Sequence, residues 1–310
     1  MAQRRYTDQE LFQLVLAADE EAFLAGDDPS DRSWKVPMTV MRQIGFESYI
    51  AGGPGTPPEF EKLRSLHAVL YRRTDTGIGG VHMGAFMFRD VFTKIEVPLI
   101  FGQVGIDPLK MTDLTPDQAH WLMTRPVDRA AFIDQFIDVF DFGYGLMELG
   151  RDRPVTSECR NMLGLAHFQL QAAAAVVTGA FDRRGAVQSA LIACELALKG
   201  GLAAASVDEG VRRNLGHDLT ALARLLGECE PGFEAARAVP AVQALPAYVH
   251  NRYASEQPDR RQTGRILMTA QYIAAEVMRS LSSRNFRADM QSMPARTWPP
   301  LVVSSDAPTA

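Results

Sequence analysis

Two long alanine-rich stretches in the middle of the chain constrain its fold more than any other feature. They run "SECRNMLGLAHFQLQAAAAVVTGA" from Ser157 and "DRRGAVQSALIACELALKGGLAAAS" from Asp182. Apolar residues recur three or four positions apart in both, the spacing of one helix face. The positions are Leu163, Ala166, Leu170, Ala173 and Val177, then Ala190, Cys194, Ala197 and Leu198. Small side chains let helices approach closely, so the pattern predicts two helices packed in a bundle.

Further helices are predicted after this pair. The segment "HDLTALARLLGE" predicts a shorter helix with an inward face, and "TGRILMTAQYIAAEVMRSLSS" predicts a long closing helix. A proline-punctuated stretch between them leaves room for a fifth short helix at about 231–247. The inward positions of the shorter helix are Leu219, Leu222, Leu225 and Leu226. We therefore predict an up-and-down bundle over residues 155–287.

The first 154 residues have a different pattern. Three helix starts carry capping signals: Thr7 with Glu10, Thr56 and Pro57 with Glu59, and Thr115 and Pro116 with Gln118. Residues 91–97 alternate between apolar and polar, as in a half-buried strand, and we expect two or three short antiparallel strands within residues 77–108. The fold class predicted for the whole chain is mainly α (α+β overall), a mixed helical region with a small antiparallel sheet followed by the bundle.

Length and composition predict how the chain is organised. A chain of 310 residues exceeds one typical core, so we expect residues 1–154 as a mixed α/β region of unknown role, 155–287 as the bundle, and 288–310 as a Pro/Ser-rich disordered tail. No run of eighteen apolar residues and no signal-like apolar segment is present. The three cysteines are widely spaced, which favours reduced thiols in a cytoplasmic protein; we expect no cofactor and no metal.

Charge is distributed unevenly along the chain. Residues 1–154 contain 16 Lys/Arg against 23 Asp/Glu, a net charge of −7, whereas residues 155–287 contain 15 against 12, a net charge of +3. The C-terminal half is therefore the better candidate to meet an anionic partner.

Several short motifs of the C-terminal half occur in a recognisable order. Glu195 and Lys199 form Glu-x-x-x-Lys, His217-Asp218-Leu219 opens the next helix, and Arg252-Tyr253, followed by Ala254, precedes the last helix. Over residues 160–285 this order resembles the HEPN domain, in which Glu-x-x-x-Lys, His-Asp-Leu and Arg-Tyr-Pro stand at these places. The resemblance implies a bundle that forms a homodimer through its first and last helices.

The resemblance also implies where a catalytic site would lie. Many HEPN domains are metal-independent RNA endonucleases with Arg, four to six residues and His near the start of the last helix. There the arginine stabilises phosphate charge and the histidine moves the proton of the 2′-hydroxyl. Arg252 matches the arginine, but after four intervening residues Gln257 stands where the histidine is expected, and His250 precedes Arg252. Since glutamine is no acid or base at neutral pH, we expect a non-catalytic member.

Arg212 and His217, with four residues between them, also satisfy the pattern of an arginine followed by a histidine, but they lie before the third helix of the bundle. There Asp218 is expected to cap that helix, with Leu219 in the core and His217 bonded locally. A structural role of the segment Arg212–Leu219 is favoured over a catalytic one. If the protein is an enzyme, the candidate catalytic residues are Arg252, His217, Arg212 and His250.

Two groups of residues are candidates for ligand binding. Glu195, Lys199, Arg252 and His217 would form an anion or nucleotide site if they converge, although Glu195 and Lys199 also suit a plain helical ion pair. Arg260, Arg261 and Arg265 form a basic cluster that is either a solvated surface or a contact for RNA phosphates. His82, His120 and the "GIGG" at 77–80 are interpreted as structural.

Three classes of function follow. The first is a non-catalytic HEPN-like protein that binds a nucleotide, RNA or a protein partner in a regulatory or defence role. The second is a metal-independent endoribonuclease. The third is a structural subunit of a larger complex that makes its contact through the aromatic segments "HMGAFMF" (82–88) and "FIDVFDFGYG" (136–145).

Overall fold

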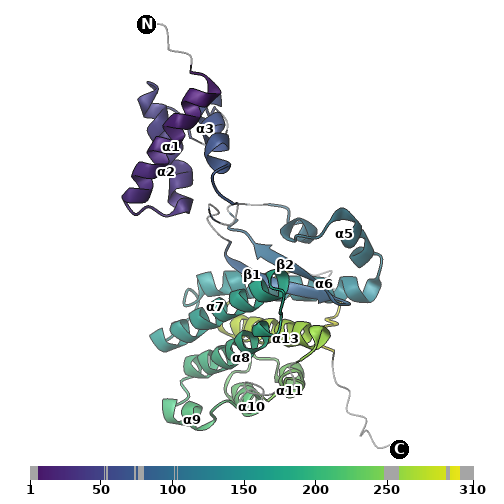
Figure 1. Cartoon of the computed structure of the whole chain (residues 1–310). Helices are drawn as coiled ribbons and strands as arrows, with labels where there is room; N and C mark the ends of the chain where they lie inside the picture. The colour runs from purple at the N-terminus through teal and green to yellow at the C-terminus, as the bar shows by residue number, and fades with distance from the viewer. Residues whose placement is uncertain are drawn as a thin grey trace, which may run out of the picture. The chain divides into compact units, whose positions relative to one another are not determined.

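The computed structural model describes residues 6–51, 53, 55–72, 75, 80–100, 102, 104–247, 258–290 and 294–300 (Figure 1). The chain consists of two compact units, residues 1–79 and residues 80–310. Helices account for 64% of the structure and strands for 6%, which confirms the mainly α, α+β fold class.

The first unit consists of three helices, α1 (Asp8–Leu24), α2 (Pro29–Gln43) and α3 (Pro58–Ala68). The predicted capping box of Thr7 and Glu10 is confirmed. At α3 the predicted cap is wrong, because Pro57 takes the N-cap position and the Thr56 hydroxyl donates instead to the Gly53 carbonyl (2.8 Å). The apolar faces of the three helices enclose a core of their own: Leu11, Val15, Val36, Val40, Met41, Phe60 and Leu63.

The second unit begins with the hairpin of β1 (His82–Phe88) and β2 (Val91–Val97), an antiparallel pair in the register His82↔Val97 to Phe88↔Val91. A short 3₁₀ helix η1 (Pro108–Met111), α5 (Pro116–Met123) and α6 (Pro126–Glu148) follow. The capping box predicted at Thr115 and Gln118 is confirmed at the start of α5. The expectation of a small antiparallel sheet is therefore confirmed.

The predicted bundle helices are present, with the expected faces inside. They are α7 (Ser157–Gly179), α8 (Gly185–Ala204), α10 (Leu219–Cys229), the short α11 (Ala235–Gln243) and α13 (Arg260–Leu281). Two further short helices, α9 (Glu209–Asn214) and α14 (Phe286–Asp289), were not predicted. Both alanine-rich stripes are fully buried, and of the four leucines of α10 only Leu225 is partly exposed.

The hairpin packs directly on the bundle. β1 contacts α6, α7 and α13, while α8 lies against α7 and α13 with α10 and α11 beyond it (Figure 1). On α13, the buried Gln271 side chain accepts from the Ala85 amide and donates to the Ala85 carbonyl (both 2.8 Å). These bonds satisfy backbone groups of β1 that do not pair with β2. The unit boundary therefore lies at 79/80, not at the expected 154/155.

Part of the expected disordered tail has a defined structure. In residues 294–300 the backbone amides of Thr297 and Trp298 donate to the Asp134 carboxylate of α6 (2.7 and 2.9 Å). The tail differs from the expectation because its polar backbone meets a buried acceptor on α6, which composition does not show. Residues 301–310 lie outside the described residues.

Two helices, α7 and α8, are long and apolar enough to cross a membrane by length and composition alone. Most of α8 is buried inside the unit, as in the core helix of a soluble protein. The structure is therefore consistent with a soluble protein.

Candidate functional site

The predicted polar cluster of the bundle forms around Glu195 on α8. Its carboxylate accepts from Lys199 Nζ (2.7 Å) and lies 2.8 Å from His217 Nδ1, just before α10. The helical ion pair and the convergence with His217 thus occur together. The remaining candidates, Arg252 and His250, lie outside the described residues.

His217 also lines a pocket of about 490 Å³ between the start of α10 and the end of α11. The next residue, Asp218, caps α10 by accepting from the Ala221 amide (3.0 Å), and Leu219 is buried, as predicted. A carboxylate on one nitrogen of an imidazole fixes the orientation of the ring. Glu195 therefore orients His217 at the edge of a pocket.

Arg212 has a different partner on a different helix. Its guanidinium forms a bidentate pair with Glu158 of α7 (2.8 and 2.7 Å), and its Nε donates to the Val207 carbonyl (3.0 Å). The hydrogen bond raises the pKa of Arg212 and lowers that of Glu158. Because Arg212 is buried and already paired, this geometry favours a structural role for it.

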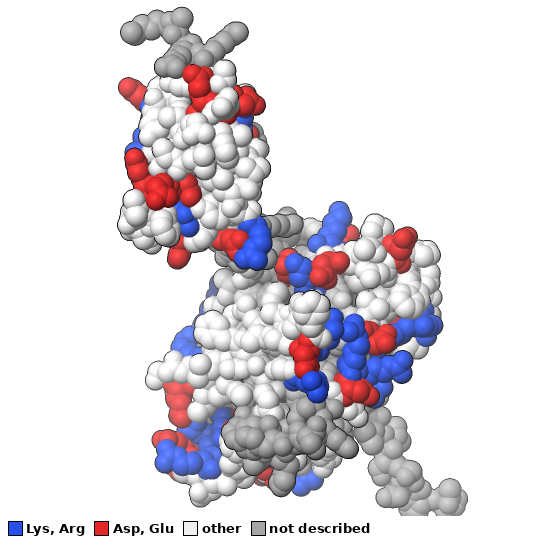
Figure 2. Space-filling view, viewed as in Figure 1, with Lys and Arg blue, Asp and Glu red and all other residues white. Residues whose placement is uncertain are grey.

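The predicted basic cluster forms part of a larger arginine pocket of about 570 Å³. Arg261 and Arg265 of α13 meet Arg89, from the β1–β2 turn, and Arg125, which precedes α6. Trp121 of α5 forms part of the wall, and the Arg89 guanidinium lies 4.9 Å from the centroid of one of its rings. Figure 2 shows Lys and Arg side chains gathered at the right of the 80–310 unit, with Asp and Glu side chains between them.

Three of these four arginines form no ion pair among the described residues, although Asp90 and Asp128 also line the pocket. Arg125 pairs with Asp128 (2.6 Å), whereas in the part of the chain that the structure describes Arg89, Arg261 and Arg265 form no ion pair. The third predicted cation, Arg260, lies beside the pocket, where it donates to the Asp90 carbonyl (2.5 Å). The pocket therefore offers exposed guanidinium groups to an anion.

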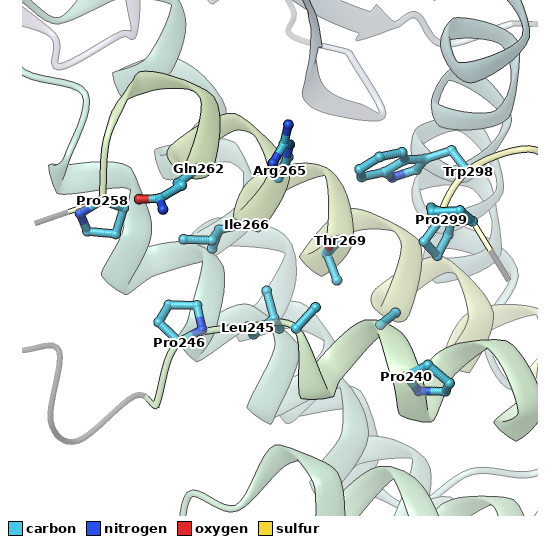
Figure 3. A pocket seen from close by; sticks show the side chains of 13 residues that line it. Pro240, Leu245, Pro246, Pro258, Gln262, Arg265, Ile266, Thr269, Trp298 and Pro299 are labelled. Atoms are coloured by element: carbon cyan, nitrogen blue, oxygen red, sulfur yellow. The ribbon is translucent and has the colours of Figure 1, made fainter. Parts of the chain in front are cut away.

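An apolar groove of about 640 Å³ adjoins the arginine pocket, between α11 and α13 (Figure 3). Ile266 and Thr269 line its α13 side, and Leu245 and Pro246 line the opposite side. Arg265 and Trp298 line both cavities, so a cation and an indole stand where the two meet. The combined surface suits a ligand that has both anionic and flat apolar parts.

Sequence reasoning missed a buried network of carboxylates and arginines. Asp134, Asp138 and Asp141 are buried on one face of α6. Arg279 bonds to Asp138 and Asp141 (both 2.7 Å), Arg296 bonds to Asp138, and Arg287 bonds to Asp134. The spacing of four and three residues was a visible signal, but the arginine partners lie more than 130 positions away in sequence.

The predicted contact surface of a structural subunit, formed by the aromatic segments 82–88 and 136–145, is wrong. Phe86, Phe88, Phe136, Phe140 and Phe142 are buried in the cores of the second unit, so these aromatic segments are not available to a partner. Their burial depends on contacts of β1 with α6, α7 and α13, which the sequence does not show.

The histidines interpreted as structural lie apart from these pockets. His82 is buried against Phe142 and His167, and His120 is exposed on α5. Among the described residues, no group of three or more His, Cys, Asp and Glu side chains could hold a metal ion.

Comparison with known proteins gives no relative: no protein-family model, curated protein or solved structure matches this chain.

Proposed function

We propose that this protein is a non-catalytic, HEPN-like helical-bundle protein that binds single-stranded RNA through the arginine pocket. One observation carries the proposal: four arginines from three separate segments converge on one pocket with an exposed tryptophan in its wall. Guanidinium groups that line one pocket and form no ion pair repel each other, so an anionic ligand would be favoured there.

The chemistry of the pocket matches the repeating parts of RNA. Guanidinium groups bind phosphate oxygens through paired N–H donors, and Arg89, Arg261 and Arg265 form no ion pair among the described residues. The Trp121 indole, over which the Arg89 guanidinium lies, is the aromatic surface in the pocket wall on which a base would stack, and base stacking on an aromatic ring contributes about 1–3 kcal/mol. The adjoining groove allows a ligand longer than one nucleotide to continue past Arg265.

The test measures binding of a fluorescently labelled single-stranded RNA by anisotropy at several salt concentrations. For the double variant Arg261→Ala/Arg265→Ala we expect at least about tenfold weaker binding and a shallower salt dependence, because two phosphate contacts are lost. Arg224→Ala, an exposed arginine of α10 outside the pocket, is the matched control and should bind as wild type.

Three results would contradict this proposal. Equal binding by the double variant and wild type would remove the pocket from the interaction. Full competition by a mononucleotide would point to a nucleotide ligand. Failure to bind any RNA or nucleotide would leave a protein partner as the remaining kind of ligand for a non-catalytic protein of this type.

The endoribonuclease is the second candidate, because Glu195 orients the His217 imidazole at a pocket edge. The assay is RNA cleavage in excess EDTA by wild type, His217→Ala and Arg252→Ala. We expect no cleavage by any of the three. Cleavage by wild type that both substitutions abolish would establish the enzyme and overturn the non-catalytic proposal.

A further inference from the structure

The arginine pocket contains a carboxylate that a site for anions alone does not need. Two acidic residues, Asp90 and Asp128, line it, and Asp128 is paired with Arg125 (2.6 Å). Asp90 is exposed, and its carboxylate forms no ion pair or hydrogen bond within the part of the chain that the structure describes. An unpaired carboxylate weakens the attraction of a pocket for phosphate, so a purely electrostatic site would be better without it.

The turn that carries Asp90 is held in place from two sides. Arg89 and Asp90 connect Phe88 and Val91, which pair across the hairpin of β1 and β2. Arg260 of α13 donates to the Asp90 carbonyl (2.5 Å), so the turn is fixed at the start of α13. Arg89 has a φ of 57°, a left-handed conformation in which glycine is the usual residue. Strain of this kind costs energy and concentrates at functional sites.

The pocket therefore combines two opposite kinds of hydrogen-bonding group. A carboxylate only accepts hydrogen bonds, and a guanidinium only donates them. The Watson–Crick edge of guanine presents one acceptor, O6, followed by two donors, N1–H and N2–H₂. The two donors match the two oxygens of one carboxylate, and O6 matches a guanidinium N–H. Adenine and cytosine have an acceptor where guanine has N1–H, and uracil has an acceptor where guanine has N2–H₂, so none of them fits both groups.

We propose that the arginine pocket selects guanine in single-stranded RNA and that Asp90 is the residue that recognises the base. The Asp90 carboxylate accepts from N1–H and N2–H₂ of guanine, and a guanidinium of the pocket donates to O6. The remaining guanidinium groups bind the phosphates. This inference rests on the proposed RNA binding and adds the base that the site prefers.

The test uses four fluorescently labelled oligouridines of equal length that differ only in the central base. This base is guanine, hypoxanthine, adenine or uracil, and hypoxanthine keeps O6 and N1–H but lacks the amino group of guanine. Anisotropy measures the dissociation constant of the full-length protein for each. Wild type should bind the guanine oligonucleotide about tenfold more tightly than the adenine and uracil ones, because a bidentate contact discriminates between bases by roughly this factor. Hypoxanthine should give an intermediate affinity.

The variant Asp90→Asn removes the charge and keeps the size of the side chain. It should lose the preference for guanine, because an amide offers one acceptor in place of two. Its affinity for the plain oligouridine should equal or exceed that of wild type, because a charge that repels phosphate is gone. Asp117→Asn, at an exposed position of α5 outside the pocket, is the matched control and should keep the preference. Far-UV circular dichroism checks that both variants are folded.

Every other pattern contradicts the inference. Equal affinity of wild type for the four oligonucleotides means that the pocket binds RNA without selecting guanine, which leaves the proposed function intact. A preference for guanine that persists in Asp90→Asn assigns the recognition to other residues. Loss of oligouridine binding in a folded Asp90→Asn gives this residue a role in shaping the pocket instead. No binding of any oligonucleotide by wild type overturns the RNA proposal and this inference together.

Discussion

His82 is a buried histidine whose two ring nitrogens have no hydrogen-bond partner among the described residues. Its ring contacts Phe142 of α6 and His167 of α7, with ring centroids 5.1 and 4.8 Å away. Burial, and then the charge of a protonated His167, hold the pKa of His82 well below its ordinary value. Burial also lowers the pKa of His167. Both rings are therefore neutral in the folded protein near pH 7.

This environment predicts a loss of stability in mild acid. An unfolded histidine titrates at about 6.5, so below that pH the unfolded chain binds protons that the folded chain does not. The contribution of the pair is complete above about pH 6.5 and falls as pH decreases, by up to about 1.4 kcal/mol per histidine for each pH unit. Urea unfolding at pH 7.5, 6.5 and 5.5 measures it.

In His82→Phe the slope of stability against pH should become shallower, because one of the two histidines no longer titrates. His120→Asn, at an exposed position, is the control and should keep the wild-type slope. An unchanged slope in His82→Phe would show that other groups cause the acid sensitivity.

At the scale of elements, α6 holds the C-terminal segment in place. Asp134 binds the backbone of residues 297 and 298, and Asp138 binds Arg296 from this segment and Arg279 from α13. Burial raises the pKa of Asp141, although Arg279 opposes the shift. Burial also disfavours the charge on Arg279, but the carboxylates around it raise its pKa overall. The arginine therefore remains charged and the network is an ionic one.

Asp138→Asn keeps the shape of the side chain and removes its charge. Breaking a buried pair by removing one partner leaves uncompensated charge, and we expect a loss of about 3 kcal/mol in the free energy of unfolding. The exposed pair of Asp182 and Arg184 is the control, and Asp182→Asn should change stability by less than about 1 kcal/mol. Urea unfolding followed by far-UV circular dichroism compares them. A loss as small as the control's would mean that the network contributes little net stability.

At the scale of the whole molecule, the buried network of aspartates and arginines changes how the net charges of residues 1–154 and 155–287 are interpreted. The acidic excess of residues 1–154 includes Asp134, Asp138 and Asp141, which Arg279, Arg287 and Arg296 neutralise inside the second unit. The net charge of +3 on residues 155–287 is therefore not the net charge of an exposed surface. An anionic partner, as proposed, would meet the local group of exposed arginines around the arginine pocket.

The two units have separate cores and should unfold separately. A three-helix unit of fewer than eighty residues buries a smaller share of its surface than the second unit, so it should be the less stable of the two. Trp34 lies in the first unit, and Trp121 and Trp298 lie in the second. Tryptophan fluorescence during urea unfolding should show two transitions. Trp34→Phe should remove the earlier one, whereas Trp121→Phe should keep it; one coincident transition in all three proteins would contradict the separation.

Sequence patterns predicted the elements of this protein better than their arrangement. The bundle helices and the hairpin were predicted because their apolar spacing is a local property of the chain. Two helices of the first unit were anticipated, α1 from a capping box that is confirmed and α3 from a cap that differs in the structure. The helix α2 was not anticipated, since Pro37 lies inside it and its N-cap residue forms no side-chain cap hydrogen bond. The Glu195–Lys199–His217 cluster was accessible because two of its members share a helix turn and the third opens the next main helix.

The sequence by itself determined which segments become helices and strands, and which of their faces are apolar, because periodicity acts over a few residues. Only the tertiary structure decided that the hairpin and α6 belong with the bundle, that three acidic residues are buried, and that Arg89, Arg125, Arg261 and Arg265 meet in one pocket. Those outcomes depend on contacts between residues more than a hundred positions apart. Such contacts form only where packing brings complementary faces together, and no local pattern encodes that choice.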